Sequence, residues 1–423
     1  AVFGGPVDFG SADIAGQFAA TAAQFKNPEH VANFNSMKVG GTAVFHRAVF
    51  GGPVDFGSAD IAGQFIIDEA QFTNTEQRAT FHNMKVGSTA ILHKAAFAGP
   101  ADFIGADIAG HFVAIEAQFT NAEQRANFNR IKVSGTAVFR KTAFAGPVSM
   151  ADAAFLDLFI LGPQGDPSRL PRLDLSRTVI TRELRMVDLT LQDMVVTSLQ
   201  VAGPTSLERL TIERKANVEH SSFLTLALSE VSWPRTSDSV QLDGMSYQHI
   251  STGSELDSWK ELINLVDQAA YNASVYATLE AFFQERGYPE RADAVFVAQK
   301  RRERREVLRG LPWTWNLLLD ILVRHGRSPS RAFGWGALFV IIGCLVFRRK
   351  EDMELENDEA GSFHYNAFWY SLDLFLPFID LKAASVWIPK QDRRFARHYM
   401  RVHTILGWIL IPIGLAALTG IIK

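Results

Sequence analysis

The sequence predicts a mainly β solenoid followed by an α-helical connector and an α-helical membrane domain. The first observation behind this prediction is a 47-residue repeat rich in phenylalanine, which begins AVFGGPVDF at Ala1 and recurs at Ala48 and, altered, at Ala95. The second is a change to helical spacing of the apolar residues after about residue 250. The third is a pair of uncharged apolar runs near the C-terminus.

Each 47-residue unit divides into two similar halves, in which large apolar residues recur mostly at a spacing of five, as in Phe50, Phe56, Ile61 and Phe65. Neither a helix, with its period of 3.6, nor a flat strand, with its period of two, keeps such residues on one face. A chain that turns a corner about every five residues keeps these large residues on its inner face. Four such sides then complete one coil. Coils stacked at the strand spacing of about 4.8 Å would make a rod of about seven coils from the regular repeats.

Units such as VDFGS, ADIAG and ANFNS resemble the pentapeptide-repeat family. The resemblance implies a right-handed quadrilateral β-helix, and it is clear over residues 1–160. A Pro- and Gly-containing break, LGPQGDPSRLPRL, comes next, and short alternating runs then predict strands. We therefore expect degenerate coils over residues 161–250, with a separate small β-domain as the alternative. Because the chain begins within a repeat, we also expect N-terminal truncation.

The predicted solenoid surface carries no strong charge. Residues 1–160 contain 14 Asp and Glu and 11 Lys and Arg, which is too balanced for the DNA mimicry known in some pentapeptide-repeat proteins. The inserts KNPEHV, TNTEQR and TNAEQR recur every 47 residues, so they should form a stripe that either binds a partner or simply covers the stack. His46 and His93 occupy equivalent positions, but the third copy has Arg140, which favours outward residues over a metal site.

Residues 251–310 form the predicted connector. Apolar residues at helical spacing, with Gly287 as a C-cap and a new helix near Pro289, resemble a helical hairpin of the tetratricopeptide kind. Because a single hairpin does not make an array of such repeats, the sequence does not predict peptide binding. The connector ends in a basic cluster that we expect to face anionic lipid, because apolar sequence follows at once. This cluster consists of Lys300, Arg301, Arg302, Arg304, Arg305 and Arg309.

Residues 311–423 form the predicted membrane domain. It begins with an amphipathic segment that carries Trp313 and Trp315 and suits the membrane interface. Residues 332–347 and 404–422 are uncharged and are predicted to span the membrane. Nine Lys and Arg lie in residues 300–331 and nine in residues 348–401, so charge does not decide the orientation.

Between the two spans, residues 366–381 predict a short amphipathic or re-entrant helix. The order of a membrane span, a short helix and a second span resembles that of some pentapeptide-repeat membrane proteins. Two-helix ion channels have the same order. The segment reads LPFID where a potassium filter would have a glycine-containing run, so potassium selectivity is not expected. Asp373, Pro377 and Asp380 are the candidate membrane-depth or pore-lining residues, and the alternative places both aspartates in the headgroup layer.

No catalytic motif, cofactor motif or metal-ligand cluster is evident, and Cys344 is the only cysteine. The sequence therefore predicts a non-enzymatic membrane-anchored solenoid that acts as a scaffold, interaction or sensor protein. The alternative is an oligomeric ion channel or pore with a cytoplasmic solenoid. The expected partners are membrane lipids, further copies of the chain and an unidentified protein, but not nucleic acid. A bacterial inner membrane with the solenoid on the cytoplasmic side is the expected location, because the N-terminal residues contain no signal-peptide pattern.

Overall fold

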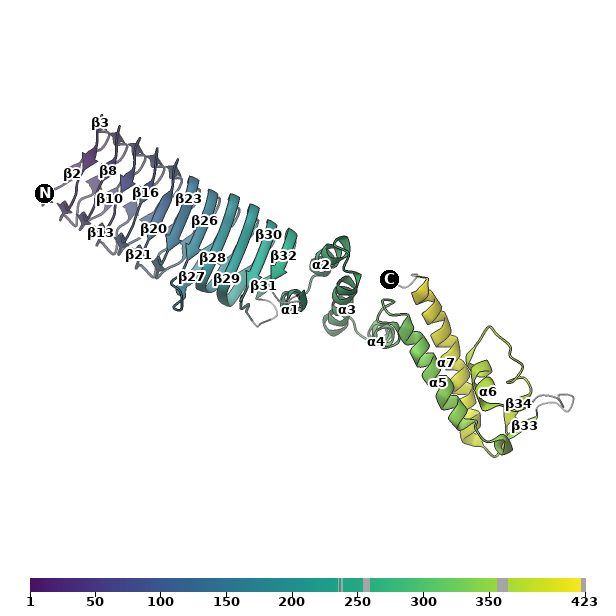
Figure 1. Ribbon diagram of the computed structural model, residues 1–423. Helices are drawn as coiled ribbons and strands as arrows, with labels where there is room; N and C mark the ends of the chain where they lie inside the picture. The colour runs from purple at the N-terminus through teal and green to yellow at the C-terminus, as the bar shows by residue number, and fades with distance from the viewer. Residues whose placement is uncertain (235, 237–238, 254–258, 356–363, 420–423) are drawn as a thin grey trace. The chain divides into compact units, whose positions relative to one another are not determined.

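The computed structural model describes residues 1–234, 236, 239–253, 259–355 and 364–419. The chain divides into two compact units, unit 1 (Ala1–Phe282) and unit 2 (Phe283–Lys423). Unit 1 is a β-solenoid of about 11 turns whose repeats are about 22 residues apart, so the predicted solenoid is confirmed (Figure 1). Helices form most of unit 2.

All strand pairs of the solenoid are parallel, and they form one sheet of seven strands and one of 25. The sheet of seven contains β1 (Val2–Phe3), β5 (Gln24–Phe25), β9 (Val49–Phe50), β13 (Gln71–Phe72), β17 (Ala96–Phe97), β21 (Gln118–Phe119) and β24 (Ala143–Phe144). The short strands of the larger sheet are β2 (Val7–Asp8), β3 (Asp13–Ile14), β4 (Phe18–Ala19), β6 (Ala32–Asn33), β7 (Lys38–Val39), β8 (Ala43–Val44), β10 (Val54–Asp55), β11 (Asp60–Ile61), β12 (Phe65–Ile66), β14 (Ala79–Thr80), β15 (Lys85–Val86), β16 (Ala90–Ile91), β18 (Ala101–Asp102), β19 (Asp107–Ile108), β20 (Phe112–Ile115), β22 (Ala126–Asn127), β25 (Val148–Ser149) and β31 (Val240–Gln241). Its longer strands are β23 (Lys132–Arg140), β26 (Ala154–Leu161), β27 (Ser168–Asp174), β28 (Val179–Val195), β29 (Gln200–Asn217), β30 (Ser222–Ser229) and β32 (Ser246–Thr252).

The register explains the 47-residue period of the sequence. Gln24 pairs with Val49, 25 residues later, and Val49 pairs with Gln71, 22 residues later. The longer step contains the insert that begins at Lys26, and the same alternation recurs in the following turns. One 47-residue unit is therefore two turns of the solenoid, one of which carries the insert.

Two residues in each of the early turns have a positive φ, including Ser11, Ala22, Ser36 and Arg47. A non-glycine residue is unfavourable in this left-handed region, by roughly 1–2 kcal/mol. Hydrogen bonds to the next turn hold these corners, as in the 2.8 Å bond that the Ser11 N–H donates to the carbonyl of Asn35. The corners let the chain change direction often enough to form short strands.

Phenylalanine rings fill the core of the first half of the solenoid. In the sheet of seven strands, Phe25 stacks on Phe50 with ring centroids 4.7 Å apart, and Phe50 stacks on Phe72 at 4.9 Å. A second stack passes through Phe56, Phe81 and further rings, and its members meet the first stack edge to face. Both arrangements are favourable for aromatic pairs, so the periodic Phe residues form one continuous core.

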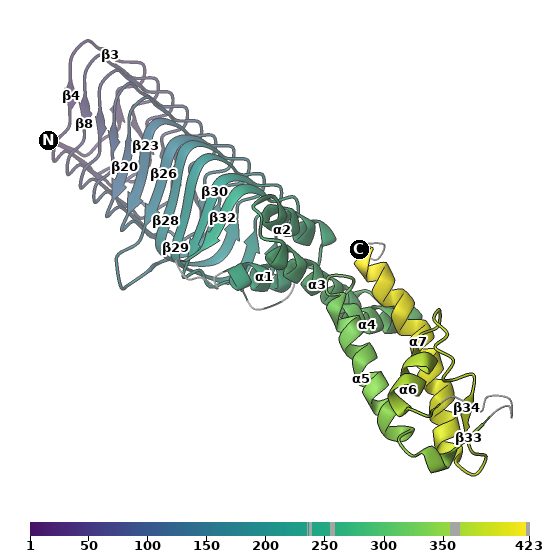
Figure 2. The ribbon, with the colours of Figure 1, turned by 45° about the vertical axis from the view of Figure 1, so that its right-hand side comes forward.

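The strands from β26 to β32 continue the parallel stack, so residues 168–252 extend the solenoid and do not form a separate β-domain (Figure 2). Aliphatic side chains replace phenylalanine in the core of this half. On its surface, arginine side chains each bind an aspartate of the preceding turn through two nitrogens. The four pairs are Asp152–Arg177, Asp157–Arg182, Asp188–Arg209 and Asp193–Arg214.

Unit 1 ends with α1 (Trp259–Gln268) and the first part of α2 (Ala273–Glu285). The Ala270 N–H donates to the carbonyl of Val240 over 2.9 Å, which ties the turn after α1 to the last part of the solenoid. The predicted connector helices are therefore present, and the side-chain oxygen of Asn272 accepts the N–H of Ser274 over 2.9 Å at the start of α2.

Unit 2 contains α3 (Pro289–Glu306), α4 (Leu311–Val323), α5 (Ser330–Val346), α6 (Ala367–Phe375), α7 (Arg394–Leu418) and a 3₁₀ turn (Lys350–Asp352). Two short strands, β33 (Met353–Leu355) and β34 (Trp387–Pro389), pair in antiparallel orientation. α6 packs against both α5 and α7, which also contact each other.

Within the described residues, α7 is the one helix that is long and apolar enough to cross a membrane. It contains residues 404–418 of the span predicted at 404–422, and residues 420–422 of that span lie outside the described part of the chain. The other predicted span, residues 332–347, falls in α5, which has 17 residues and is a shorter apolar helix.

Candidate functional site

The basic cluster at the end of α3 is largely engaged within unit 2. Arg301 and Arg304 both bind the carboxylate of Asp320 on α4, at 3.0 and 3.1 Å. The side chain of Asp320 is buried and that of Arg304 is mostly buried, so this three-residue ion cluster fixes α4 against α3. Burial alone would raise the pKa of Asp320, but the hydrogen bonds and charges of the two arginines hold it below its usual value.

The remaining members of the cluster differ in exposure. Arg302 is buried and pairs with Glu306 at 2.8 Å, and Lys300 pairs with Glu303 at 3.0 Å. Arg305 and Arg309 lie on the exposed side, where Arg309 donates to backbone carbonyls. Of the six predicted lipid-facing residues, the structure leaves Arg301, Arg305 and Arg309 exposed.

α4 buries two polar residues against α3, although many of its apolar residues are exposed. Asn316 and Asp320 are buried against α3, and the Asn316 side chain donates to the carbonyl of Lys300 over 3.2 Å. Large apolar side chains are exposed on the other side of the helix. They are Leu311, Trp313, Trp315, Leu318 and Ile321. Such a helix suits a site where one face contacts protein and the other contacts hydrocarbon.

Small residues let α5, α6 and α7 approach closely. A Cβ atom at Gly407 would lie 2.0 Å from the carbonyl oxygen of Phe375, and one at Gly343 would lie 2.1 Å from Ser371 Oγ. Neither position therefore accommodates a larger side chain without a shift of the neighbouring helix. Close packing through small residues is typical of helices that associate within membranes.

A polar contact that the sequence did not predict lies at the centre of these three helices. Ser371 on α6 donates to the carbonyl of Val340 over 2.9 Å and lies 3.2 Å from Nε2 of His403 on α7. Both side chains are fully buried. A single serine and a single histidine 32 positions apart carry no sequence signal, so only their packing reveals the pair.

The three predicted membrane-depth or pore-lining residues lie at the end of α6 and in the loop after it. Asp373 is buried and accepts backbone N–H groups from Leu381, Ala383 and Ala384 at 2.6–2.9 Å. It therefore closes the loop back onto α6. Asp380 is exposed and accepts the N–H of Lys382 over 2.8 Å.

Pro377 accounts for the length of α6, which ends at Phe375 although helical sequence was predicted to residue 381. Leu376 has an extended backbone, with φ −90° and ψ 103°. A residue before proline is driven toward this conformation because the proline ring clashes with a helical neighbour. Pro377 thus separates α6 from the loop, so Asp373 and Asp380 do not share one helical face.

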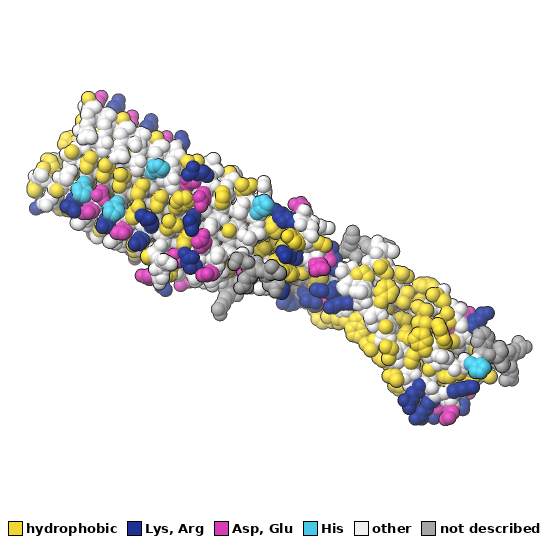
Figure 3. Space-filling view, in the orientation of Figure 1, with side chains coloured by type: hydrophobic (Ala, Val, Ile, Leu, Met, Phe, Trp, Pro, Cys, Tyr) yellow, Lys and Arg dark blue, Asp and Glu magenta, His cyan; other side chains and the backbone are white. Residues whose placement is uncertain are grey.

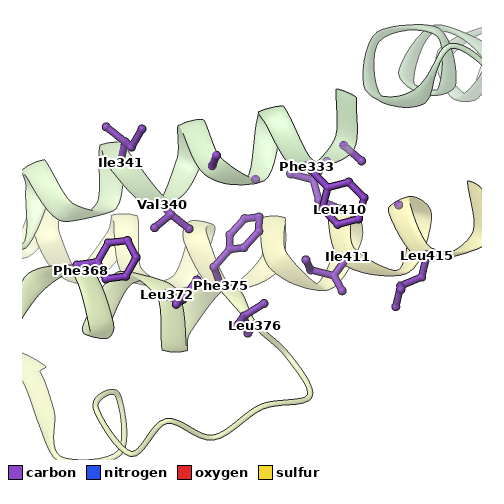
Figure 4. A pocket seen from close by; sticks show the side chains of 14 residues that line it. Phe333, Val340, Ile341, Phe368, Leu372, Phe375, Leu376, Leu410, Ile411 and Leu415 are labelled. Atoms are coloured by element: carbon purple, nitrogen blue, oxygen red, sulfur yellow. The ribbon is translucent and has the colours of Figure 1, made fainter. Parts of the chain in front are cut away.

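α5, α6 and α7 also border an apolar groove of about 430 Å³ (Figure 4). Its lining is made of Ala, Gly, Val, Ile, Leu and Phe only. Val340 and Phe375 lie at its buried wall, and Phe333 and Ile341 are half exposed at its edge. The groove offers no hydrogen-bonding side chain, so it suits a hydrocarbon and not a polar ligand.

On the solenoid, His46 and His93 flank one carboxylate. Their Nδ1 atoms lie 2.9 and 2.7 Å from the two oxygens of Asp68, which belongs to the turn between them. All three side chains are partly exposed. Among the residues that the structure describes, no group of three or more His, Cys, Asp and Glu side chains could hold a metal ion.

Comparisons of the chain with protein families, with curated proteins and with solved structures found no match. Functional inference therefore depends on the residues and their geometry.

Proposed function

We propose that this protein is a non-enzymatic, membrane-anchored β-solenoid that acts as a scaffold or interaction protein, with unit 2 as the membrane domain. In this proposal the solenoid is a right-handed quadrilateral β-helix of the pentapeptide-repeat kind. α5 and α7 cross the membrane, and α4 lies in its interface. A bacterial inner membrane with a cytoplasmic solenoid remains the proposed location.

The distribution of exposed apolar side chains carries the proposal. Among the described residues, 27 large hydrophobic side chains are exposed, and only Val2, Val31, Val179 and Leu224 of these belong to unit 1 (Figure 3). Contiguous apolar surface of this extent is unusual on a protein surrounded by water, whereas it is required in hydrocarbon. Positive and negative side chains mix on the visible face of the solenoid, which fits a water-exposed domain that binds another protein.

Membrane fractionation of the full chain tests the anchor. The wild-type chain should sediment with membranes and resist alkaline carbonate, and detergent should release it. Ile405→Arg combined with Ile409→Arg places two charges on the exposed face of α7 and should move the chain to the carbonate-soluble fraction. The matched control, Val179→Arg with Leu224→Arg, changes exposed apolar residues of unit 1 and should leave fractionation unaltered. A wild-type chain that is soluble without detergent would refute the proposal.

An oligomeric ion channel or pore is a second candidate. The observation that favours it is the order of α5, α6 and α7, with a loop that Asp373 holds against the end of the short helix. In this reading the exposed Asp380 meets the permeating ions. Full-length protein in liposomes should then conduct cations, and Asp380→Asn should reduce the flux, with Asp392→Asn as an exposed control. Absence of flux would remove this candidate, and equal flux in all three proteins would remove Asp380 from the path of the ions.

A further inference from the structure

Six successive turns of the solenoid carry a column of alternating charges on one face. Its residues are register partners on neighbouring strands, so that Asp13 on β3 lies beside Lys38 on β7, and Lys38 lies beside Asp60 on β11. The same register continues through β15 and β19 to β23. The charge therefore changes sign at every turn. This charge column consists of Asp13, Lys38, Asp60, Lys85, Asp107 and Lys132.

The charge column faces water and makes little use of its charges within the chain. Its members are exposed, apart from the half-exposed Asp107, and the residues that follow them from Val39 onward are buried in the core. Among the residues that the structure describes, Lys132 and Asp107 form the one ion pair of the column, at 4.0 Å. The alternation keeps like charges from being neighbours, which would destabilise the stack. The other four charges remain available to an external partner.

Small side chains flank the charge column and leave it open to another surface. Two positions after each charge the chain has Ala, Gly or Ser, and all six of these residues are exposed. A partner can therefore approach the charges on that side without meeting a long side chain. The flanking residues are Ala15, Gly40, Ala62, Gly87, Ala109 and Ser134.

The alternation of charge selects the partner. A uniformly acidic partner, such as nucleic acid, would meet a like charge at every second turn, and so would a uniformly basic one. A second copy of the column in reverse order presents Lys wherever the first presents Asp. Two columns that run in the same direction at the same height would instead oppose like charges. Over its whole length the column is therefore complementary to itself only in the antiparallel arrangement.

We propose that two copies of this chain associate side by side and antiparallel through their charge columns. In this dimer Asp13 of one copy meets Lys132 of the other, and Lys38 meets Asp107, on both sides of a twofold axis. Exposed ion pairs are individually weak, so the charges fix the direction and register of the dimer more than its affinity. The inference rests on the interaction role proposed above and names its partner. It does not need the membrane anchor, because the column lies within unit 1.

Carbodiimide crosslinking of the full-length protein in mild detergent tests the direction, because this reagent joins a carboxylate and an amine that are in direct contact. Mass spectrometry should identify a crosslink between Asp13 and Lys132. Within one chain these residues are five turns apart, about 24 Å at the strand spacing, so the crosslink requires two copies. Raising the salt concentration from about 0.05 M to about 0.5 M should suppress it. A wild-type protein that gives no such crosslink at low salt would overturn the proposal.

Charge reversal tests the pairing with two complementary variants. Lys38→Glu with Lys85→Glu and Lys132→Glu makes the column entirely acidic, and Asp13→Lys with Asp60→Lys and Asp107→Lys makes it entirely basic. Each variant alone should self-associate about tenfold more weakly than the wild type in sedimentation velocity at low salt. An equimolar mixture of the two should associate again, because every contact then joins opposite charges.

The matched control reverses three charges on another corner of the solenoid, with Arg47→Glu, Lys94→Glu and Lys141→Glu. Arg47 and Lys94 already pair within the chain, with Glu69 and Glu116, so this variant should associate as the wild type does.

A mixture that associates no better than its separate components, when both retain the wild-type circular dichroism, would refute pairing between columns. The column would then serve only the stability of the stack. If a variant fails to fold, the wild-type crosslink still decides the question. Failure of the membrane anchor is recognised separately, because it changes fractionation and leaves the Asp13–Lys132 crosslink intact.

Discussion

Arg304 of α3 and Asp320 of α4 form an ion pair of 3.1 Å in which the side chains are 15% and 8% exposed. Arg301 binds the same carboxylate. The single acidic group of Asp320, on the largely apolar α4, therefore pairs with two arginines of α3. The pairing explains how α4 can present tryptophan and leucine outward while it stays attached to the protein. It also predicts which charges are needed for the fold of unit 2.

Asp320→Asn should destabilise unit 2, because it leaves the mostly buried Arg304 without a counter-charge. Loss of one partner of a buried pair costs about 3 kcal/mol. Denaturation of the full-length protein in detergent, followed by tryptophan fluorescence, measures this loss. Glu303→Gln, which removes the more exposed pair with Lys300, should cost less than about 1 kcal/mol. Equal effects of the two substitutions would contradict the role given to Asp320.

The stability of unit 2 should decrease on mild acidification because of His325. Burial lowers the pKa of His325 below its ordinary value of 6.5, and the nearby Arg304, Lys300 and Arg301 lower it further, although Asp320 opposes them. As the pH falls through 6.5, the unfolded chain binds a proton that the folded chain does not, so the free energy of unfolding falls. This loss levels off once the pH is below the pKa of the folded state.

The variant His325→Gln isolates that contribution. Its free energy of unfolding should depend less on pH between about pH 7 and about pH 5 than that of the wild type. Asp320 does not contribute in this interval, because its pKa lies below the ordinary value of 3.8. Identical pH dependence of the two proteins would show that His325 does not carry the effect.

Phe81→Ala should destabilise the solenoid by about 3–5 kcal/mol, the usual cost of removing a buried aromatic ring. Phe81 is fully buried and stacks on Phe56 and Phe103, with ring centroids 5.3 and 4.5 Å away. Chemical denaturation followed by far-ultraviolet circular dichroism measures the change. Lys85→Ala alters an exposed residue of the same turn and should have little effect. A small effect of Phe81→Ala would mean that the phenylalanine stack is not the main source of stability.

Arg182→Ala should lower the melting temperature of the solenoid by more than Arg177→Ala does. Both arginines bind an aspartate 25 positions earlier through two nitrogens. Asp157, the partner of Arg182, is fully buried, whereas Asp152, the partner of Arg177, is exposed to water. Loss of Arg182 therefore leaves a buried carboxylate without its counter-charge. Scanning calorimetry of the two variants compares them directly, and a larger fall for Arg177→Ala would refute this explanation.

Much of the solenoid could be predicted because its information is local and repeated. Phe50, Phe56, Ile61 and Phe65 lie in or directly after four successive short strands, β9 to β12, and the same pattern returns in the next turn. The inserts could also be placed in alternate turns, since they recur with the period of the repeat. The arginine–aspartate pairs of the second half escaped prediction, because their separation varies between 21 and 25 residues and no repeat marks them.

In unit 2 the sequence indicated apolar helices and a basic segment but not their contacts. Asp373 and Asp380 look alike in the sequence. In the structure Asp373 is buried and accepts three backbone N–H groups, whereas Asp380 is exposed and accepts one. Ser371 and His403 are unremarkable residues until α6 and α7 are packed together. Such contacts depend on which faces of the helices meet, and no short-range pattern encodes that choice.

The sequence by itself determined that a phenylalanine-rich repeat of 47 residues folds as a solenoid and that apolar helices follow it, because hydrophobic spacing dictates local backbone geometry. Only the tertiary structure decided that Asp320 pairs with two arginines, that Asp373 closes a loop and that three helices leave an apolar groove between them. These features arise where segments distant in sequence are brought together. Their energies come from burial and charge pairing in three dimensions, which residue order alone does not specify.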